Sequence, residues 1–283
     1  MPELPEVETV VRGLRQTVLG KTIKSVITNA PVNSIVVSQS FGRRNFASIL
    51  KGRSIRGITR RGKNILISLS GNITLWVHLK MTGHFYYLKK SVATGKHDLV
   101  LFDFETASIG KNEYNLRFND YRRFGRLRLY RDEELWQQDG LKDLGPEPLE
   151  TKANQFVELC QSGRRMIKPA LLDQTFIAGL GNIYADESLH AARIHPRRIT
   201  SSISGRKLTE LHGHIQRLLK LAIRNMGTSV DSYSGVNGQP GSFQKYLKAY
   251  GREGDPCQFC GRKIVREKIG ARSAHFCPRC QRA

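Results

Sequence analysis

Acidic residues are scarce in this chain compared with basic ones. Its 283 residues include 24 aspartates and glutamates against 46 lysines and arginines, so the formal net charge is +22. An imbalance of this size favours an extended polyanion as the partner, and we expect the protein to bind DNA or RNA. Hydrophobic residues still make up 39% of the chain, which excludes a disordered polycation and is enough for folded cores.

Long apolar runs are also missing. No stretch approaches the roughly 18 apolar residues that a membrane-spanning helix needs. The start of the chain, which contains Glu3, Glu6 and Glu8, has no apolar segment typical of a signal peptide. We therefore expect a cytoplasmic protein associated with the nucleoid.

Cysteine is rare and unevenly placed. Only Cys160 lies outside the last 27 residues, and the others form the pairs Cys257-x2-Cys260 and Cys277-x2-Cys280, with sixteen residues between the pairs. This spacing predicts four thiolates around one tetrahedral Zn²⁺. Because four sulfur ligands leave no position for water, we expect a structural ion. Two disulfides are the alternative, but a protein that is not exported disfavours them.

Hydrophobic periodicity divides the chain into helical and strand-like parts. Apolar residues at spacings of three and four predict a helix over 4–18 that ends near Gly20. Helical patterns return late in the chain, at 154–160, 182–194 and 207–226. Between them lie short strand-like runs: 22–28, 64–69, 73–79, 84–88, 98–104, 114–120 and 125–130. Runs at this spacing are typical of a β-sandwich or barrel.

These patterns predict an α+β protein of several domains. Two prolines in "LGPEPLE" mark a linker, and "GTSVDSYSGVNGQPGS" at 227–242 reads as a mobile glycine- and serine-rich loop. The expected divisions are an N-terminal helix and sandwich (1–138), a linker (139–150), a helical domain that includes the loop (151–248) and a zinc finger (249–283).

Several motifs occur in order along the whole chain. They are "PELPEVET" at the start, "RRGK" at 60–63, "HLKMTG" at 78–83, "RRFG" at 122–125, "LGPEPL" at 144–149, "GLGNIYADE" at 179–187 and "YGREGDPC" at 250–257. Together they resemble the formamidopyrimidine-DNA glycosylase family. The resemblance implies a helix on a β-sandwich, a helix–two-turn–helix domain and a zinc finger, in a bifunctional DNA glycosylase and AP lyase that acts as a monomer on double-stranded DNA.

By this resemblance the chemistry lies at the N-terminus. Removal of Met1 would free the secondary amine of Pro2, and α-amino groups titrate near pH 8, so a useful fraction is neutral. The family's amine attacks C1′ of the damaged nucleotide and forms a Schiff base. Glu3 matches the general acid that protonates the sugar ring oxygen. Glu6 either supports that acid or stabilises the helix start through its dipole.

Other residues carry over to DNA contacts and strand cleavage. Lys63 matches the lysine that assists β-elimination beside the lesion phosphate, and Arg272 matches the zinc-finger arginine that assists δ-elimination. A base must leave the duplex before it can react, and the residues matching the wedge that fills the gap are Met81, Arg122 and Phe124. The remaining matches to DNA-binding positions are His78, His97, Arg164, Lys168 and Asn182.

The loop at 227–242 resembles the lid that closes over a flipped purine in this family. Two residues depart from the family pattern. Lys80 stands where a small residue is expected, and Tyr121 precedes "RRFG" where proline is common. Both lie beside the wedge residues, so they leave the preference for the opposite base open.

Three alternatives to an oxidised-purine glycosylase follow from the same features. The first is the sister specificity for oxidised pyrimidines, as in endonuclease VIII, although the long loop and "YGREGDPC" favour purines. The second is a non-catalytic zinc-finger protein that binds damaged DNA, against which Pro2, Glu3 and Lys63 argue. The third is a basic zinc-binding ribosomal protein, which would explain neither the wedge motifs nor a sandwich before the finger.

The net charge of +22 predicts that affinity for nucleic acid falls steeply with salt. Each phosphate contact releases a counterion, so log affinity against log salt should have a slope near −0.9 per contact. Fluorescence anisotropy of a labelled duplex, titrated at several salt concentrations, measures this slope. A flat salt response would contradict binding dominated by the phosphate backbone.

Overall fold

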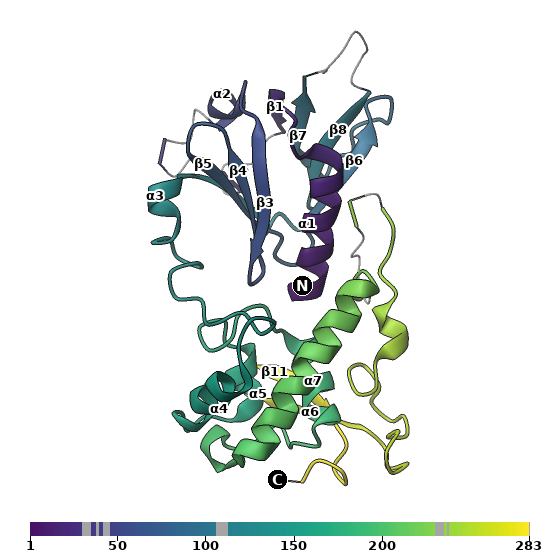
Figure 1. The fold of residues 1–283 in the computed structure, drawn as a ribbon. Helices are drawn as coiled ribbons and strands as arrows, with labels where there is room; N and C mark the ends of the chain where they lie inside the picture. The colour runs from purple at the N-terminus through teal and green to yellow at the C-terminus, as the bar shows by residue number, and fades with distance from the viewer. Residues whose placement is uncertain are drawn as a thin grey trace. The chain divides into compact units, whose positions relative to one another are not determined.

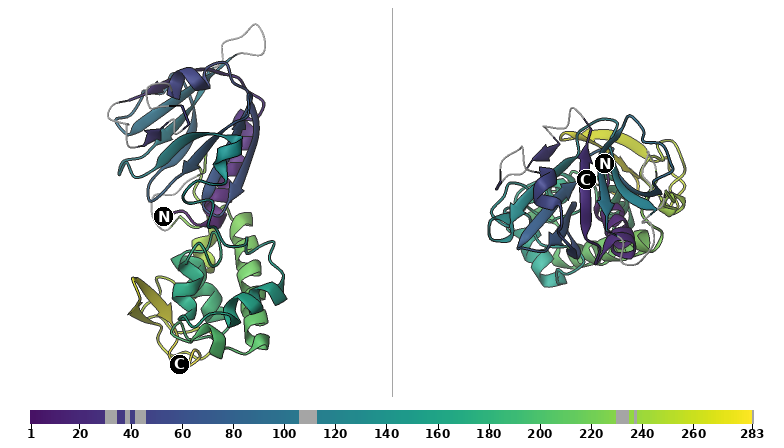
Figure 2. Two further views of the ribbon diagram at one scale, coloured as in Figure 1. Left: turned by 90° about the vertical axis from the view of Figure 1, so that its left-hand side faces the viewer. Right: turned by 90° about the horizontal axis from the view of Figure 1, so that it is seen from above.

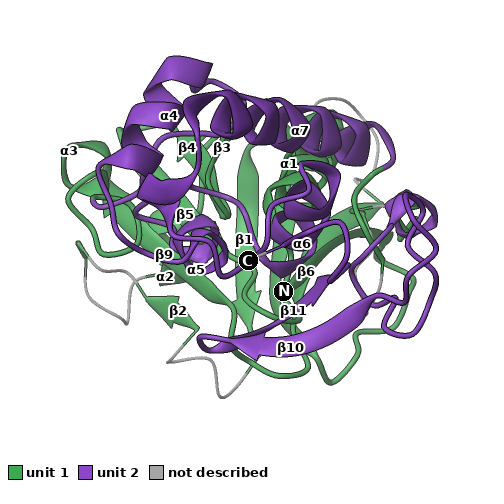
Figure 3. Cartoon of the chain, turned by 90° about the horizontal axis from the view of Figure 1, so that it is seen from below, with its two compact units in different colours: residues 1–142, 226–242 green, residues 143–225, 243–283 purple. Residues whose placement is uncertain are grey.

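The computed structural model describes residues 1–29, 35–37, 40–41, 46–105, 113–229, 235–236 and 238–282. The chain forms two compact units (Figures 1 and 3), unit 1 from residues 1–142 and 226–242 and unit 2 from residues 143–225 and 243–283. The segment 226–242 was expected in the helical domain because of its place in the chain. Its contacts instead group it with unit 1, where Val236 is buried in the core.

Unit 1 contains two β-sheets that share one hydrophobic core (Figure 2). One has the order β1-β7-β8-β6 and the other the order β2-β9-β5-β4-β3, and among the described strands of these two sheets only β2 and β9 pair in parallel. The strands are β1 (Ile23–Thr28), β2 (Val36–Val37), β3 (Ile55–Arg61), β4 (Asn64–Leu69), β5 (Ile73–His78), β6 (His84–Lys89), β7 (Asp98–Phe104), β8 (Tyr114–Asn119) and β9 (Arg126–Arg131). This arrangement is the predicted sandwich.

Helix α1 (Leu4–Val18) covers this core and runs beside β3 (Figure 1). Its apolar residues at spacings of three and four, including Val7, Val11 and Leu14, are each about 1% exposed or less. A stripe of this kind buries one face of the helix and fixes its rotation about its own axis. Two short helices, α2 (Phe46–Leu50) and α3 (Asp132–Leu135), complete unit 1.

Unit 2 is helical, with a β-hairpin near the end of the chain. It contains α4 (Ala153–Gln161), α5 (Ile167–Leu172), α6 (Asn182–Ala191), α7 (Gly205–Arg224), the turns η2 (Thr200–Ser202) and η3 (Phe243–Tyr246), and the hairpin β10 (Val265–Ile269) with β11 (Arg272–Phe276). Helix α6 packs against α5, α7 and β11, so it is central to the unit (Figure 3).

The elements expected from periodicity are confirmed, with small shifts at their ends. The helix expected over 182–194 ends at Ala191, and the helix expected over 207–226 spans Gly205–Arg224. The structure adds β2, β3, α2, α3 and α5, which the sequence did not indicate. Among the residues that the structure describes, no helix has the length and apolar character needed to cross a membrane.

Candidate functional site

Glu3 and Glu6 form a capping box at the start of α1, in which each side chain accepts a hydrogen bond from the backbone N–H of the other residue. The Glu3 side chain accepts from the backbone of Glu6, and the Glu6 Oε2 atom accepts from the backbone N–H of Glu3 at 2.8 Å. Glu3 and Glu6 are 4% and 2% exposed, and Pro2 beside them is buried. A capping box satisfies two N–H groups that the first helical turn leaves unpaired. It therefore fixes the backbone at the N-terminal end of α1, next to Pro2.

The same Glu6 carboxylate also holds the start of the 226–242 segment. Its Oε1 atom accepts from the backbone N–H of Thr228 at 2.8 Å. Gly227 lies so close that an added Cβ would come within 2.7 Å of Glu6 Oε1, and its φ is +77°. Glycine is thus required here by both space and backbone conformation. No local sequence pattern indicates the contact between Glu6 and Thr228, because these residues are 222 positions apart.

The other end of this segment returns to its beginning. The N–H of Gly241 donates to Ser229 Oγ at 2.8 Å, and a Cβ on Gly241 would meet the Gly227 carbonyl oxygen at 2.3 Å. Between these ends, Val236 lies against Gly13 of α1, and its carbonyl accepts from the N–H of Tyr87 at 3.0 Å. Residues 230–234 and 237 of the expected lid lie outside the described residues.

Strand register brings the other candidate residues of unit 1 to one end of the strands β4, β5 and β9. Asn64 at the start of β4 pairs with His78 at the end of β5, which pairs with Arg126 at the start of β9. Lys63, Met81 and Phe124 lie in the loops directly beyond these paired residues. The β-ladder therefore gathers side chains that are far apart in the sequence.

Contacts between α1 and β3 set the direction of the helix relative to this edge. Glu8 pairs with Arg60 at 3.3 Å, whereas Arg15 donates to the carbonyl of Ile58 at 2.6 Å. The N-terminal end of α1 therefore lies beside the C-terminal end of β3. Pro2 and Glu3 consequently lie toward the same end of the sheet as the turn between β3 and β4. This turn contains Lys63, whose side chain is 5% exposed.

Asp120 joins the two loops that carry the expected wedge. Its carboxylate, which is 0% exposed, accepts from the hydroxyl of Thr82, from the N–H of Arg122 at 3.2 Å and from the N–H of Gly125 at 2.7 Å. An aspartate that accepts from backbone N–H groups a few residues ahead is a known turn-forming arrangement. The pattern "NDYRRFG" could therefore have indicated this role, which the sequence analysis missed.

The wedge side chains themselves are accessible. Phe124 is 46% exposed, its ring lies 4.7 Å from the guanidinium of Arg122, and Met81 is half-buried. Both residues that depart from the family pattern adjoin them. Tyr121 is 54% exposed, and Lys80 has a φ of +54°, a left-handed conformation that is uncommon for residues other than glycine.

Positive charge is concentrated around His78. Burial, and after it the nearby charges of Lys80, Lys63 and Arg126, together lower the pKa of His78 to about 3. The ring is therefore neutral at physiological pH, and its Nδ1 accepts from the N–H of Lys80 at 3.0 Å. Burial and then the charges of Arg126 and Arg128 also lower the pKa of Lys80.

His97 lies near the loop that carries the wedge, and a buried ion pair supports it. Its carbonyl accepts from the N–H of Asp120 at 3.0 Å, and its ring lies edge-on to Tyr121. The next residue, Asp98, pairs with Arg117 at 3.2 Å, and the two side chains are 8% and 1% exposed. Arg117 also donates to the carbonyls of Val92 and Ala93, which fixes the approach to His97.

In unit 2, Asn182 begins α6 after a turn that contains Gly179, whose φ is +88°. Its side-chain Oδ1 atom is buried, and among the described residues it has no hydrogen-bond partner. A helix N-terminus presents unpaired N–H groups and the positive end of the helix dipole, which suits an anion. Arg164 is exposed in the connection between α4 and α5.

Lys168 is not the surface cation that a direct phosphate contact requires. It is 0% exposed, and its ammonium donates to Asp186 Oδ1 and to the carbonyl of Ser273, each at 2.5 Å. The other Asp186 oxygen accepts from the N–H of His275 at 2.9 Å and lies 3.0 Å from its ring nitrogen. Lys168 thus holds β11, where the exposed Arg272 is the first residue, against α5 and α6.

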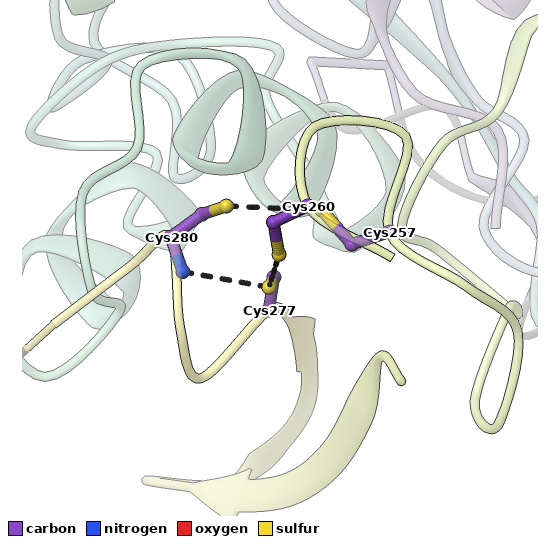
Figure 4. A group of neighbouring side chains, drawn as sticks. All are labelled: Cys257, Cys260, Cys277 and Cys280. Atoms are coloured by element: carbon purple, nitrogen blue, oxygen red, sulfur yellow. Dashed lines mark hydrogen bonds between the residues drawn. The ribbon is translucent and has the colours of Figure 1, made fainter. Parts of the chain in front are cut away.

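The four clustered cysteines converge at one point (Figure 4). Their sulfur atoms all lie within 4.8 Å of one another, with Cys257 and Cys280 at 4.0 Å and Cys260 and Cys277 at 3.5 Å. Tetrahedral coordination with zinc–sulfur bonds of about 2.3 Å requires sulfur–sulfur distances of about 3.8 Å. The distances and the all-thiol donor set fit a structural Zn²⁺ ion.

The thiols of the cysteine cluster differ in pKa. A backbone hydrogen bond from Arg262 lowers the pKa of Cys260 to about 7, whereas burial is the main cause that raises the pKa of Cys280 to about 12. Zinc binds thiolates, so it must displace the remaining protons. Burial also raises the pKa of the Cys160 thiol to about 12, and this side chain, in α4, is 0% exposed.

Family models match all three parts of the chain. Residues 1–127 match the formamidopyrimidine-DNA glycosylase N-terminal domain, residues 144–234 match the H2TH domain of the same enzyme, and residues 254–283 match a zinc finger found in FPG and IleRS. The chain belongs to the formamidopyrimidine-DNA glycosylase family. It is therefore a DNA glycosylase of DNA repair, and the fold and zinc ion implied by the sequence motifs are confirmed.

Individual relatives agree over the full length. The chain is 43% identical to the formamidopyrimidine-DNA glycosylase of Pelotomaculum thermopropionicum, with 100% of this chain and 99% of that protein covered. It is 44% identical to that of Pediococcus pentosaceus, with 99% of each covered.

Solved structures of one relative also match the whole chain. Lactococcus lactis FPG, bound as a mutant to DNA that contains Fapy-dG, has a TM-score of 0.89 and 34% identity, with 100% of both chains covered. The same protein bound to DNA with an abasic site has a TM-score of 0.88 and 34% identity, with 99% of this chain and 100% of that chain covered.

The sulfur geometry predicts that Cys257→Ser lowers the zinc content from about one ion per chain to a small fraction, because structural zinc needs all four ligands. Plasma emission spectroscopy measures the metal, and thermal denaturation measures the loss of stability. Cys160→Ser is the matched control and should keep its zinc. Retention of a full zinc equivalent by Cys257→Ser would contradict a four-thiolate site.

Proposed function

We propose that this chain removes oxidised purines, such as 8-oxoguanine and formamidopyrimidines, from duplex DNA and then cleaves the strand at the abasic site. The amine of Pro2 is the nucleophile. The observation that carries this proposal is the reciprocal cap of Glu3 and Glu6, which fixes the backbone beside Pro2 at the end of α1. A nucleophile acts efficiently only when its position relative to the reacting atom is fixed.

Removal of Met1 exposes the nucleophile. Met1 is 41% exposed, so it is accessible for cleavage, and its loss converts the Pro2 amide nitrogen to a secondary amine. The amine attacks C1′, the glycosidic bond breaks, and the base leaves with its electron pair and takes up the proton that the amine nitrogen loses. Cleavage of the bond between C1′ and the ring oxygen then turns the bond between C1′ and nitrogen into an iminium double bond. Since the resulting iminium nitrogen has no proton to lose, it stays cationic and draws electrons from the sugar.

Glu3 protonates the ring oxygen as the sugar opens. Its carboxyl is 4% exposed and lies in the first turn, where Glu6 holds the Glu3 backbone through the bond to the N–H. General acid catalysis needs a carboxyl held within hydrogen-bond reach of the atom that takes up the proton, and this bond fixes the backbone that carries Glu3. Glu6 therefore acts as a positioning residue for both Glu3 and the Thr228 segment.

Strand cleavage follows from the cationic intermediate. Loss of a proton from C2′ expels the 3′ phosphate, and a second elimination expels the 5′ phosphate. Lys63 serves the first step and Arg272 the second, each by neutralising charge on a departing phosphate. Lys63 lies in a tight β3–β4 turn and Arg272 begins β11, so both sit at the ends of strands that limit their movement.

Duplex DNA is the partner, and its target base must be turned out of the stack before it reacts. Phe124 and Met81 fill the vacated space, and Arg122 bonds the base left opposite. The exposed pair of Arg122 and Phe124, held by Asp120, supports this role. Asn182 and the N-terminus of α6 bind backbone phosphate. Lactococcus lactis FPG forms complexes with DNA that contains Fapy-dG or an abasic site, which supports the same substrates here.

Specificity for oxidised purines rests on the long 226–242 segment and on the family. The alternative is the specificity of endonuclease VIII for oxidised pyrimidines. A cleavage panel of duplexes containing 8-oxoguanine, formamidopyrimidine or thymine glycol, each with varied opposite bases, separates the two. Preferred cleavage at thymine glycol would overturn the purine assignment while leaving the Pro2 mechanism intact.

We expect borohydride to trap a covalent complex between the processed protein and an 8-oxoguanine duplex. Reduction converts the iminium to a stable amine, so the adduct should survive denaturing electrophoresis, and peptide mass spectrometry should locate it at Pro2. The control is the same protein with Met1 retained, which should bind the duplex but form no adduct. An adduct on the Met1-retaining protein, or none on the processed one, would refute Pro2 as the nucleophile.

A further inference from the structure

His190 is in direct contact with the cysteine cluster of unit 2. It lies in the last turn of α6, is 1% exposed, and its Nε2 atom is 3.4 Å from the sulfur of Cys257. That separation is normal for a hydrogen bond to sulfur. No motif in the sequence marked this residue, and its partner lies 67 positions away.

The chemistry of the contact assigns the proton to the histidine. A zinc-bound cysteine is a thiolate, which has no proton and can only accept. The ring nitrogen that faces it must therefore carry the hydrogen. Zinc with four thiolates also has a net negative charge, and the end of α6 adds the negative end of the helix dipole. A donor at this position offsets both.

Neighbouring contacts hold the ring in place. The His190 ring packs on Phe259, at 5.2 Å between centroids, and the guanidinium of Arg193 lies 4.6 Å from the same Phe259 ring. Phe259 lies between Cys257 and Cys260. The turn that carries the first Cys-x2-Cys pair is therefore packed on the end of α6. The turn that carries the second pair, Cys277 and Cys280, contacts the chain just after α6, because Gln281 donates to the carbonyl of Ile194 at 2.9 Å.

We propose that His190 is a positioning residue of the zinc site, whose Nε2–H donates to the Cys257 thiolate and slows loss of the metal. Residues that hydrogen-bond a metal ligand orient it and change metal affinity by roughly 10- to 100-fold. The same helix begins at Asn182, so His190 also links the zinc site to the opposite end of α6.

The test compares His190→Phe and His190→Gln with the unmodified holoprotein. His212→Phe is the matched control, since His212 is also buried in unit 2, at 5% exposed, and also packs on a phenylalanine, at 5.3 Å from Phe156. Transfer of zinc to a chromophoric chelator gives the release rate. Cobalt-substituted protein gives the energy of the sulfur-to-metal charge-transfer band, which reports hydrogen bonds to the thiolates.

His190→Phe should release zinc on the order of 10-fold faster or more. Its charge-transfer band should move to longer wavelength, because an unbonded thiolate gives up electrons more easily. His190→Gln keeps an N–H donor and should lie between, while His212→Phe should match the unmodified protein in both measurements.

An unchanged charge-transfer band in His190→Phe would overturn the proposal, even if zinc were lost faster, because loss of packing alone explains faster loss. If His190→Phe does not fold, His190→Leu, which also lacks a donor, replaces it: a charge-transfer band moved to longer wavelength than that of His190→Gln supports the hydrogen bond, and a band identical to that of the unmodified protein refutes it.

Discussion

The candidate site of unit 1 depends on two hydrogen bonds that the Glu6 carboxylate accepts. One oxygen accepts the N–H of Glu3 and the other accepts the N–H of Thr228, so a single buried side chain fixes both the start of α1 and the start of the 226–242 segment. Buried acceptors of this kind are costly to leave unpaired, by about 1–3 kcal/mol each. An acidic helix start in a protein of net charge +22 is thus a structural requirement.

Helix α6 has a comparable place in unit 2. Its first residue, Asn182, belongs to the proposed phosphate site, Asp186 in its middle binds Lys168, and His190 in its last turn reaches Cys257. The zinc ion therefore does more than close a small module that lacks a core of its own. It holds β11 and Arg272 in a fixed relation to α6, so the proposed phosphate contact of Asn182 and the proposed cleavage role of Arg272 depend on one rigid element.

Local patterns predicted much of this architecture, and distant pairings account for what they missed. The period of α1 and the cysteine spacing are set by nearby residues, so both could be derived from the sequence. Strand β3 was missed because its register shifts between Ile55 and Gly57, which breaks the alternation that marks a strand. The resemblance predicted Lys168 as a DNA contact, and its burial was not foreseen because its partners, Asp186 and Ser273, lie 18 and 105 positions away. The roles of Pro2 and Glu3 came from resemblance, since in isolation they read as a helix start.

Single-turnover excision of 8-oxoguanine by Glu6→Ala, compared with Glu8→Ala, tests the central claim most directly. Both variants remove one carboxylate from α1, but Glu8 pairs with Arg12 and Arg60 and caps nothing. Displacement of catalytic groups by about 1 Å costs on the order of 100-fold in rate. We predict a loss of that size for Glu6→Ala, in protein that is still folded by circular dichroism, and a rate near that of the unmodified protein for Glu8→Ala. Equal rates for the two variants would contradict the claim that Glu6 positions the site.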